Sequence, residues 1–275
     1  MKPVIREIAA KTILNRSKAG GYSLNCYIGC RHGCIYCYAR YMQRFHPHEQ
    51  AWGDFVDVKV NAVEVLHRQL RRAEPGQVFV SSACDAYQPE ESRRGLTRRC
   101  AQLLMERGFQ VNILTKSTLV LRDLDMYAGY GRARIGVTVT TPDETLARLW
   151  EPRAALPGRR FEVLRAARQM GLATSVMFGP LLPGVSDDAD TIELLFAKAA
   201  LLEVDAIWTD ALNPRPKVWP AIRDMLSRER HSLVSLYRKA LFEKAWRESY
   251  LRSLRDRITA AARAADVADR LAGCP

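Results

Sequence analysis

Three cysteines in one short segment are the residues of this sequence most suited to chemistry. Cys30, Cys34 and Cys37 form the pattern Cys-x3-Cys-x2-Cys within the segment NCYIGCRHGCIYCYAR. Thiols this close in sequence can turn toward one centre on a compact loop, and Gly29 and Gly33 give the backbone freedom that the bends require. Because thiolates are soft ligands, the pattern indicates an iron-sulfur cluster or zinc and disfavours magnesium or calcium.

A fourth thiol, Cys26, leaves two other kinds of metal site open. With Cys26 included, the spacing is compatible with a closed four-cysteine zinc site or a four-thiolate electron-transfer cluster. Structural zinc sites usually pair two Cys-x2-Cys knuckles, however, and this segment contains one such pair. Cys26 also falls inside a predicted strand. We therefore expect Cys26 to be a small buried residue and the other three cysteines to hold an open cluster.

Six strand-like runs alternate with helical periodicity and must position this loop. The helical segments are each long enough for a crossover between parallel strands, and Gly108 and Gly171 stand where two of them should end. Repeated units of this kind predict a parallel sheet with right-handed crossovers, and six are too few for a closed eight-fold barrel. The predicted strands are residues 22–28, 77–83, 109–115, 133–140, 172–178 and 204–210.

Polar residues follow several of these strands. Functional groups of parallel α/β folds gather at the carboxyl ends of the strands. We therefore expect these polar side chains to surround one site. They are Ser81, Ser82, Asp85, Lys116, Ser117, Thr138, Thr140, Asn213 and Arg215.

The composition bounds the class of protein. The chain has 275 residues, of which 48% are hydrophobic, so a core large enough for an enzyme is available. No apolar run is long enough for a membrane span or signal peptide, and the crowded cysteines do not resemble a disulfide framework. The sequence thus predicts a cytoplasmic protein with reduced thiols and no membrane partner.

The C-terminal part has a character of its own. After Pro220 the pattern is almost wholly helical, which predicts a helical extension over residues 216–275 packed on a domain of residues 1–215. From Asn213 onward there are 14 Lys/Arg and 7 Asp/Glu, a net charge of +7 in 63 residues, against +12 for the whole chain. This asymmetry permits a nucleic acid as a partner without requiring one.

The cysteine pattern, with Tyr36 just before its last cysteine, resembles the signature of the radical S-adenosylmethionine (SAM) superfamily. The strings CDAYQPEE (84–91), LTKSTLVLRDLD (114–125) and LWEP (149–152) are similar to its spore photoproduct lyase-like branch. The resemblance covers roughly residues 10–215. It implies a partial (β/α)6 TIM-like barrel, which together with the helical extension is the fold that we expect.

The resemblance also implies a reaction. Cys30, Cys34 and Cys37 would hold a 4Fe-4S cluster whose fourth iron chelates SAM. An electron from a flavodoxin- or ferredoxin-type donor would cleave SAM reductively and generate a 5′-deoxyadenosyl radical, which abstracts hydrogen from a substrate that the sequence does not identify. Two alternatives stay open: a photoproduct lyase-type repair enzyme acting on nucleic acid, and a non-catalytic zinc or electron-transfer protein that binds nucleic acid.

The resemblance assigns roles to further residues. Lys116, directly after an apolar strand, is expected to bind the SAM carboxylate, with Ser117 adding a hydroxyl. Tyr36 and Tyr38 would contact adenine and relay hydrogen. Photoproduct lyases use a cysteine in the radical pocket as a hydrogen donor, and for Cys84, at the end of the second strand, two interpretations stay open: a thiol that reaches this pocket, or a buried apolar residue. The other residues expected to bind the cofactor are Ser82, Asp85, Thr138 and Thr140.

Several candidates receive a structural interpretation instead. His32 is expected to face solvent, since three thiolates already satisfy the motif, and His46 and His48 are expected to lie in a surface turn. For Arg122, Asp123, Glu151 and Pro152, a buried salt link or a helix cap explains the residues as well as a site does.

Overall fold

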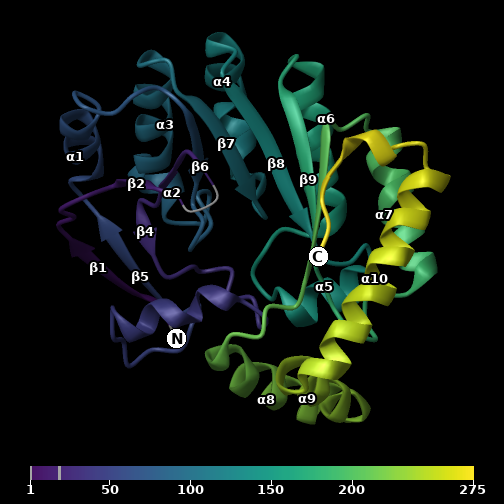
Figure 1. The fold of residues 1–275 in the computed structure, drawn as a ribbon. Helices are drawn as coiled ribbons and strands as arrows, with labels where there is room; N and C mark the ends of the chain where they lie inside the picture. Colours follow the sequence, from purple (N-terminus) through teal and green to yellow (C-terminus); the bar gives the residue numbers. More distant parts are fainter. Residues whose placement is uncertain (1, 18–19) are drawn as a thin grey trace.

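A computed structural model describes residues 2–17 and 20–275, in which an eight-stranded sheet carries the crossover helices (Figure 1). All neighbouring strands of this sheet are parallel except β2 and β3, which are antiparallel. In sheet order the strands are β11 (Leu271–Gly273), β10 (Ala206–Ala211), β9 (Ala173–Leu181), β8 (Ala133–Val139), β7 (Gln110–Thr115), β6 (Gln77–Val80), β3 (Tyr22–Leu24) and β2 (Leu14–Arg16).

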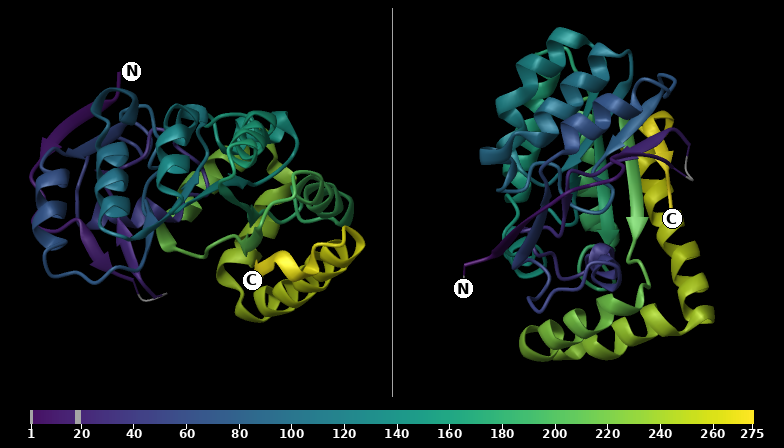
Figure 2. Two further views of the ribbon diagram at one scale, coloured as in Figure 1. Left: turned by 90° about the horizontal axis from the view of Figure 1, so that it is seen from above. Right: turned by 90° about the vertical axis from the view of Figure 1, so that its left-hand side faces the viewer.

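Six of these strands, β3 and β6 to β10, run in chain order across the sheet, which confirms the partial (β/α)6 barrel. The view along the strands in Figure 2, left, shows the crossover helices on the outside of the sheet. Gly108 and Gly171 have positive φ at the ends of two of these helices, as predicted. The helices that follow the six strands are α1 (Ala62–Gln69), α3 (Leu96–Glu106), α4 (Leu124–Tyr130), α6 (Pro157–Gln169), α7 (Ala189–Leu201) and α8 (Trp219–Glu229).

The predicted first strand, residues 22–28, is divided between two sheets. Its first half is β3 of the large sheet, and its second half is β4 (Tyr27–Ile28), which pairs with β5 (Phe55–Lys59) in a three-stranded sheet with β1 (Val4–Ile8). The chain bends at Asn25 and Cys26 because the Asn25 side-chain oxygen accepts a hydrogen bond from Ala83 N at 2.9 Å. Cys26 is therefore not a strand residue, although it is fully buried as expected.

The C-terminal segment is not wholly helical. After α8 come α9 (Val234–Phe242) and α10 (Lys244–Ala264), and α10 packs against α7. The chain then returns to the sheet, where β11 pairs in parallel with β10. Gly273 permits this pairing, because a Cβ there would lie 2.6 Å from the Trp208 ring.

Two hydrophobic cores position the functional loop. The larger core fills the space between the sheet and its helices. The second joins the cysteine loop to α8 and α9, with Trp150 stacked on Tyr237 at a ring distance of 5.4 Å. Helices α8 and α9 thus form one wall around the loop. The domain boundary between residues 215 and 216 stays a prediction. None of the helices in the described part of the chain has the length and apolar character needed to cross a bilayer.

Candidate radical site

The cysteine loop connects β4 to the short helix η1 (Tyr38–Arg44). Gly29 and Gly33 have φ values of 83° and 64°, in the left-handed region that favours glycine. A Cβ at Gly29 would lie 2.6 Å from Phe55 O, and one at Gly33 would lie 2.9 Å from the Arg153 guanidinium. Both bends inferred from the sequence therefore favour glycine for the backbone angle, and Gly29 is also required for space, because the atom that it would meet belongs to the backbone.

The three thiols of the loop face a common cavity at the carboxyl ends of the strands. Burial raises the pKa of Cys34 to about 12, and burial also raises the pKas of Cys30 and Cys37 above their usual value. Thiols in such surroundings stay protonated unless a cation stabilises the thiolate, and coordination to iron supplies that charge. The donor set therefore fits a metal cluster.

The cavity has a volume of about 270 Å³ and gathers most of the residues predicted for the site. They reach it from the loop and from the ends of β6, β7, β8 and β10. The predicted residues that line it are Cys30, Cys34, Cys37, Tyr36, Tyr38, Ser81, Ser82, Cys84, Asp85, Lys116, Thr138 and Asn213, whereas Arg215 is not part of the lining.

Two predicted cofactor-binding residues, Ser117 and Thr140, lie outside the cavity lining. The Ser117 hydroxyl accepts a hydrogen bond from Leu119 N at 3.2 Å and caps η2 (Thr118–Asp123). The Thr140 hydroxyl is buried 3.0 Å from each of Tyr36 Oη, Glu151 Oε1 and Gly179 O. Thr140 therefore acts on the site through Tyr36, because no face of its hydroxyl is left for a ligand.

Asp85 holds the site together. Its carboxylate accepts hydrogen bonds from Thr115 Oγ1 at 2.6 Å, Lys116 N at 2.7 Å and Tyr87 N at 2.9 Å, and lies 3.2 Å from His32 Nε2. Burial raises the pKa of this carboxyl, but His32 and the hydrogen bonds outweigh burial and the net pKa is well below its usual value. With this many protein donors, Asp85 positions the ends of β6 and β7 more readily than it binds a cofactor.

His32 is buried, contrary to the expectation that it faces solvent. Its Nδ1 lies 3.2 Å from Arg153 O, and its other ring nitrogen faces Asp85. The imidazole is drawn inward because it links the cysteine loop to two segments distant in sequence. His48 also departs from the expected surface turn: its ring stacks on Phe55 at 3.8 Å and pairs with Asp57 at 3.0 Å.

Tyr36 is fixed by a buried ion pair. Its hydroxyl donates a hydrogen bond to Glu151, whose carboxylate pairs with the buried Arg160 guanidinium. Arg160 also donates to Ala155 O at 2.6 Å and Thr138 O at 2.8 Å. Glu151 thus forms a buried salt link with Arg160, which was one interpretation of the LWEP string. It also orients the Tyr36 side chain in the cavity.

Lys116 brings the positive charge predicted for the cavity. Its Nζ lies 5.8 Å from the centroid of the Tyr36 ring, and the side chain forms no ion pair within the described residues. Because its ammonium group also lowers the pKas of Cys34 and Glu151, it faces the loop from the end of β7. An anionic ligand group beside the thiols would meet this charge.

Cys84 lines the cavity from the turn after β6, which begins with Ser81 at a φ of 67°. Its Sγ lies 3.6 Å from Ser81 Oγ and 4.0 Å from Asn25 Oδ1. Burial raises its pKa to about 11. Asn25 supports this turn by accepting a hydrogen bond from Ala83 N, and Tyr38 donates another to Ser82 O. The sequence analysis had given Asn25 no role.

Sequence reasoning also missed lining residues that have no motif. Phe79, Met177 and Asp210 line the cavity from β6, β9 and β10. The sequence marks them only by the alternation of residues along each strand. That alternation shows which face of the sheet a side chain is on, but not that a cavity lies over this face. Across residues 2–17 and 20–275, no three His, Cys, Asp or Glu side chains lie close enough together to hold one metal ion.

Cys26 is separate from the cysteine loop's cavity. It lies in the main core, where a hydrogen bond with Cys100 and burial both raise its pKa. It is not among the residues that line the cavity.

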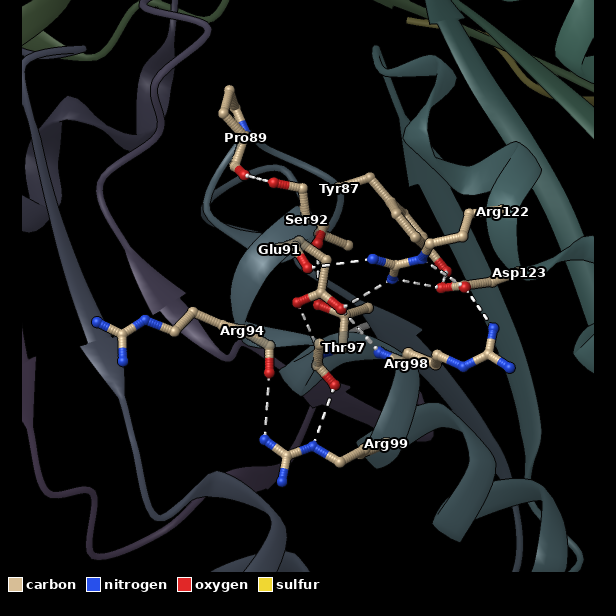
Figure 3. A network of polar contacts seen from close by, with 12 residues as sticks. Tyr87, Pro89, Glu91, Ser92, Arg94, Thr97, Arg98, Arg99, Arg122 and Asp123 are labelled. Atoms are coloured by element: carbon tan, nitrogen blue, oxygen red, sulfur yellow. Dashed lines mark hydrogen bonds and ion pairs between the residues drawn. The ribbon is translucent and has the colours of Figure 1, made fainter.

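Arg122 and Asp123 form a salt link, as one interpretation of the RDLD string predicted, but only the carboxylate is buried and the Arg122 side chain is 34% exposed. Arg122 Nε lies 2.7 Å from Asp123 Oδ1, and Tyr87 Oη donates to the same carboxylate at 3.1 Å. Figure 3 shows that Glu91 joins this network through Arg122 and the backbone of Thr97 and Arg98. The network lies behind the site and supports the segments that lead to it.

Comparisons with known proteins find relatives of this chain. The sequence profile described as the radical SAM superfamily matches residues 24–195. An uncharacterised protein of Methanocaldococcus jannaschii is 32% identical over 185 residues, which are 66% of this chain and 70% of that protein. An uncharacterised protein of Mycobacterium tuberculosis is 29% identical over 266 residues, which are 92% of this chain and 78% of that protein.

Solved structures share the fold. Spore photoproduct lyase complexed with dinucleoside spore photoproduct superposes with a TM-score of 0.70 at 13% identity, covering 96% of this chain and 80% of the other. A variant of that lyase with bound AdoMet gives a TM-score of 0.69 at 12% identity, over the same shares of the two chains. Methylornithine synthase gives a TM-score of 0.51 at 16% identity, covering 74% of this chain and 54% of the other.

Proposed function

The chain belongs to the radical SAM superfamily, and we propose that it binds a 4Fe-4S cluster through Cys30, Cys34 and Cys37 and uses it to cleave SAM reductively. The observation that carries the proposal is the shared cavity, in which the three thiols meet the free ammonium group of Lys116. When bound, the cluster and SAM supply a 5′-deoxyadenosyl radical that abstracts hydrogen from substrate. Because this superfamily consists of enzymes, membership in it does not support the alternative of a non-catalytic zinc or electron-transfer protein.

The protein's own residues position the cofactor. Lys116 binds the SAM carboxylate, because it is the cavity's unpaired cation beside the thiols in the described chain. Ser82 and Thr138 offer hydroxyl groups from the ends of β6 and β8 to the amino group or ribose. Tyr36, held by Glu151, supplies a fixed aromatic surface near the adenine. The wall formed with α8 and α9 excludes water from this side of the loop.

Cys84 and Tyr38 are the groups of the cavity suited to returning a hydrogen atom. Burial raises their pKas to about 11 and about 12, so both keep their hydrogens at neutral pH. A substrate radical would break the Sγ–H bond of Cys84, form a C–H bond and leave a thiyl radical. These roles extend the resemblance to the lyase-like branch and are part of the proposal.

A second candidate is a repair lyase acting on nucleic acid. The fold shared with spore photoproduct lyase supports this candidate, since that structure holds a dinucleoside spore photoproduct. The residues lining the cavity do not support it, because the acidic Asp85 and Asp210 lie there together with Lys116 and His32, so the cavity is not uniformly basic. The basic C-terminal residues are partly engaged within the protein, as Arg247 donates to Leu212 O and Arg255 to Pro275 O. We therefore propose a compact substrate first and a nucleic acid second.

Anaerobic reconstitution followed by iron and sulfide analysis tests the cluster. The reduced protein should release 5′-deoxyadenosine from SAM, whereas Cys30→Ser, Cys34→Ser and Cys37→Ser should neither hold the cluster nor cleave SAM. Cys26→Ser is the matched control, because this buried thiol lies in the main core, outside the cavity. Tightly bound zinc without iron, or loss of iron only in the Cys26 variant, would overturn the assignment.

The choice between substrates is tested by DNA binding at several salt concentrations. Binding through several phosphates weakens steeply as salt rises. Tight, strongly salt-dependent binding that falls when Arg252 and Arg257 of α10 are replaced by alanine would favour the lyase and a basic C-terminal surface. Weak binding with little salt dependence would leave the compact substrate as the proposal.

A further inference from the structure

A basic hollow lies between α1 and β2, the strand at one edge of the large sheet. Figure 1 shows these two elements beside each other at that edge. The hollow has a volume of about 870 Å³. Of the ten described residues that line it, five are lysine or arginine and none is aspartate or glutamate. The basic residues are Lys11, Arg16, Arg68, Arg71 and Arg72.

The side chain of Gln69 joins the two elements and fixes the shape of the basic hollow. Its amide oxygen accepts hydrogen bonds from Ile13 N at 2.8 Å and Leu14 N at 3.0 Å, and its amide nitrogen donates one to Leu14 O at 2.9 Å. On the strand, the Arg16 guanidinium lies 4.5 Å from the centroid of the Tyr22 ring. The lining is therefore held in place by contacts within the protein.

The five cations of the basic hollow have no acidic partner among the described residues. None of them forms an ion pair there, whereas other exposed arginines do, such as Arg168 with Asp205 and Arg228 with Asp224. Like charges around one hollow repel one another, and the partial negative charge at the C-terminal end of α1 offsets only part of that repulsion. A bound ligand with several negative charges would remove it.

The lining is suited to phosphate groups and not to nucleobases. Four of the five cations are arginines, whose planar guanidinium groups bind pairs of phosphate oxygens. Tyr22 is the one aromatic residue of the described lining, and its ring lies under Arg16 and is only 6% exposed, so it offers no free face for a base to stack on. The Gln69 amide, which could otherwise read a base edge, is already bonded to the backbone of Ile13 and Leu14.

We propose that the basic hollow binds a ligand with several adjacent phosphate groups, which Arg68, Arg71 and Arg72 hold at the end of α1. Two sources offer this chemistry: a free polyphosphate chain, and the sugar-phosphate backbone of a single-stranded nucleic acid.

The basic hollow is separate from the radical cavity. The chain after α1 leads to the start of β6, whereas the radical cavity lies at the carboxyl ends of the strands, and the two share no lining residue in the described chain. Binding in the hollow therefore needs neither the cluster nor SAM, and its failure would leave the proposed radical chemistry untouched.

Binding to the full chain without its cluster tests the proposal. The probes are inorganic tripolyphosphate, followed by calorimetry, and a fluorescent oligothymidine, followed by anisotropy. The double variant Arg71→Gln, Arg72→Gln should weaken binding about 10- to 100-fold at low salt. For the oligothymidine, it should also reduce the slope of log K against log salt by about 1.4, the share of two phosphate contacts to a single strand.

Arg148→Gln, Arg165→Gln is the matched control. It removes the same number of charges from exposed arginines of α5 (Glu144–Trp150) and α6, which form no ion pair in the described chain and do not line the hollow. Its affinity for both probes should equal that of the unchanged protein. The probe that binds the unchanged protein more tightly identifies the source of the phosphates.

The position of the ligand is measured on the unchanged protein by lysine acetylation and mass spectrometry. The bound probe should protect Lys11, which lines the hollow, and leave Lys244 reactive, since the Lys244 side chain is 90% exposed on α10. Binding of neither probe would overturn the inference. Equal losses in the two double variants, or protection of Lys244 at least as strong as that of Lys11, would also overturn it.

Discussion

Two buried glutamates each accept a hydrogen bond from a tyrosine in the segment that carries the cysteines, one from within the cysteine loop and one from β4, just before it. Glu151 accepts from Tyr36, and Glu91 accepts from Tyr27. Burial raises the pKa of both carboxyls, but for Glu151 the Arg160 guanidinium and Lys116 outweigh it and the net pKa is below the usual value. For Glu91 burial prevails and the net pKa is raised.

The difference comes from where the nearest cation lies. Arg160 is as buried as Glu151 and pairs with it directly, while the Arg122 guanidinium lies 3.6 Å from Glu91 and its side chain is 34% exposed. A cation in water is a weaker partner than one in the same low-dielectric surroundings. The carboxyl beside Tyr36 therefore stays ionised to lower pH than the carboxyl beside Tyr27.

The largest effect is expected from Glu151→Gln. The change leaves Arg160 buried without its charge partner, and breaking one side of a buried pair costs about 3–5 kcal/mol of unfolding free energy. Urea unfolding of the protein without iron measures it. The double variant Glu151→Gln, Arg160→Met should recover part of the loss, because it leaves no unpaired buried charge. A loss below about 1 kcal/mol would show that the pair is not the support described.

Lys116→Gln should have the second-largest effect, which is on the binding of SAM. Removing a charge-assisted hydrogen bond to the SAM carboxylate should raise the SAM dissociation constant about 10- to 100-fold, with little change in stability. Equilibrium dialysis with the reconstituted protein measures it. Lys59→Gln is the control, since that ammonium group bonds to Asn25 O and does not line the cavity. Equal affinity in the two variants would remove Lys116 from the site.

Glu91→Gln should cost much less than Glu151→Gln. The amide oxygen can take the place of Oε2 and still accept from Tyr27 and Thr97 N, so only the bond from Arg98 N to the other oxygen is lost, and Arg122 keeps Asp123 as its partner. We expect a loss of about 1 kcal/mol or less at neutral pH, measured by the same unfolding experiment. A loss as large as that of Glu151→Gln would show that the two glutamates are equivalent after all.

The smallest effect is a difference in pH dependence. The pKa of Glu151 is lowered by folding, so its stabilisation is complete above the unfolded value of about 4.3 and is lost as pH falls through the folded pKa. The pKa of Glu91 is raised, so its contribution is present below about 4.3 and is lost as pH rises through the folded pKa. Unfolding of each Gln variant and the unchanged protein over a pH series should give opposite slopes, and parallel curves would contradict the assignment.

Much of the fold follows from short-range pattern. Alternating apolar residues and glycine stops mark the five strands from 77 onward, and each has a counterpart in β6 to β10 within a few residues. The bend at Cys26 was missed because it depends on a hydrogen bond between Asn25 and Ala83, which are 58 positions apart. The return of the chain as β11 was missed for a similar reason, since a strand of three residues is stabilised by its neighbour β10 and not by its own sequence.

The candidate site divides in the same way. The sequence by itself determined that three thiols lie close together on one loop, because their spacing is a local property, and from this it predicted the cluster ligands that we propose. It also placed Lys116 and Cys84 at strand ends that share a cavity. Only the tertiary structure decided that His32 turns inward to Asp85, that Thr140 acts through Tyr36, and that basic side chains from two distant segments surround one hollow. These depend on which distant segments meet, and at His32 and Thr140 also on burial, which is what makes a charge or a hydrogen bond consequential.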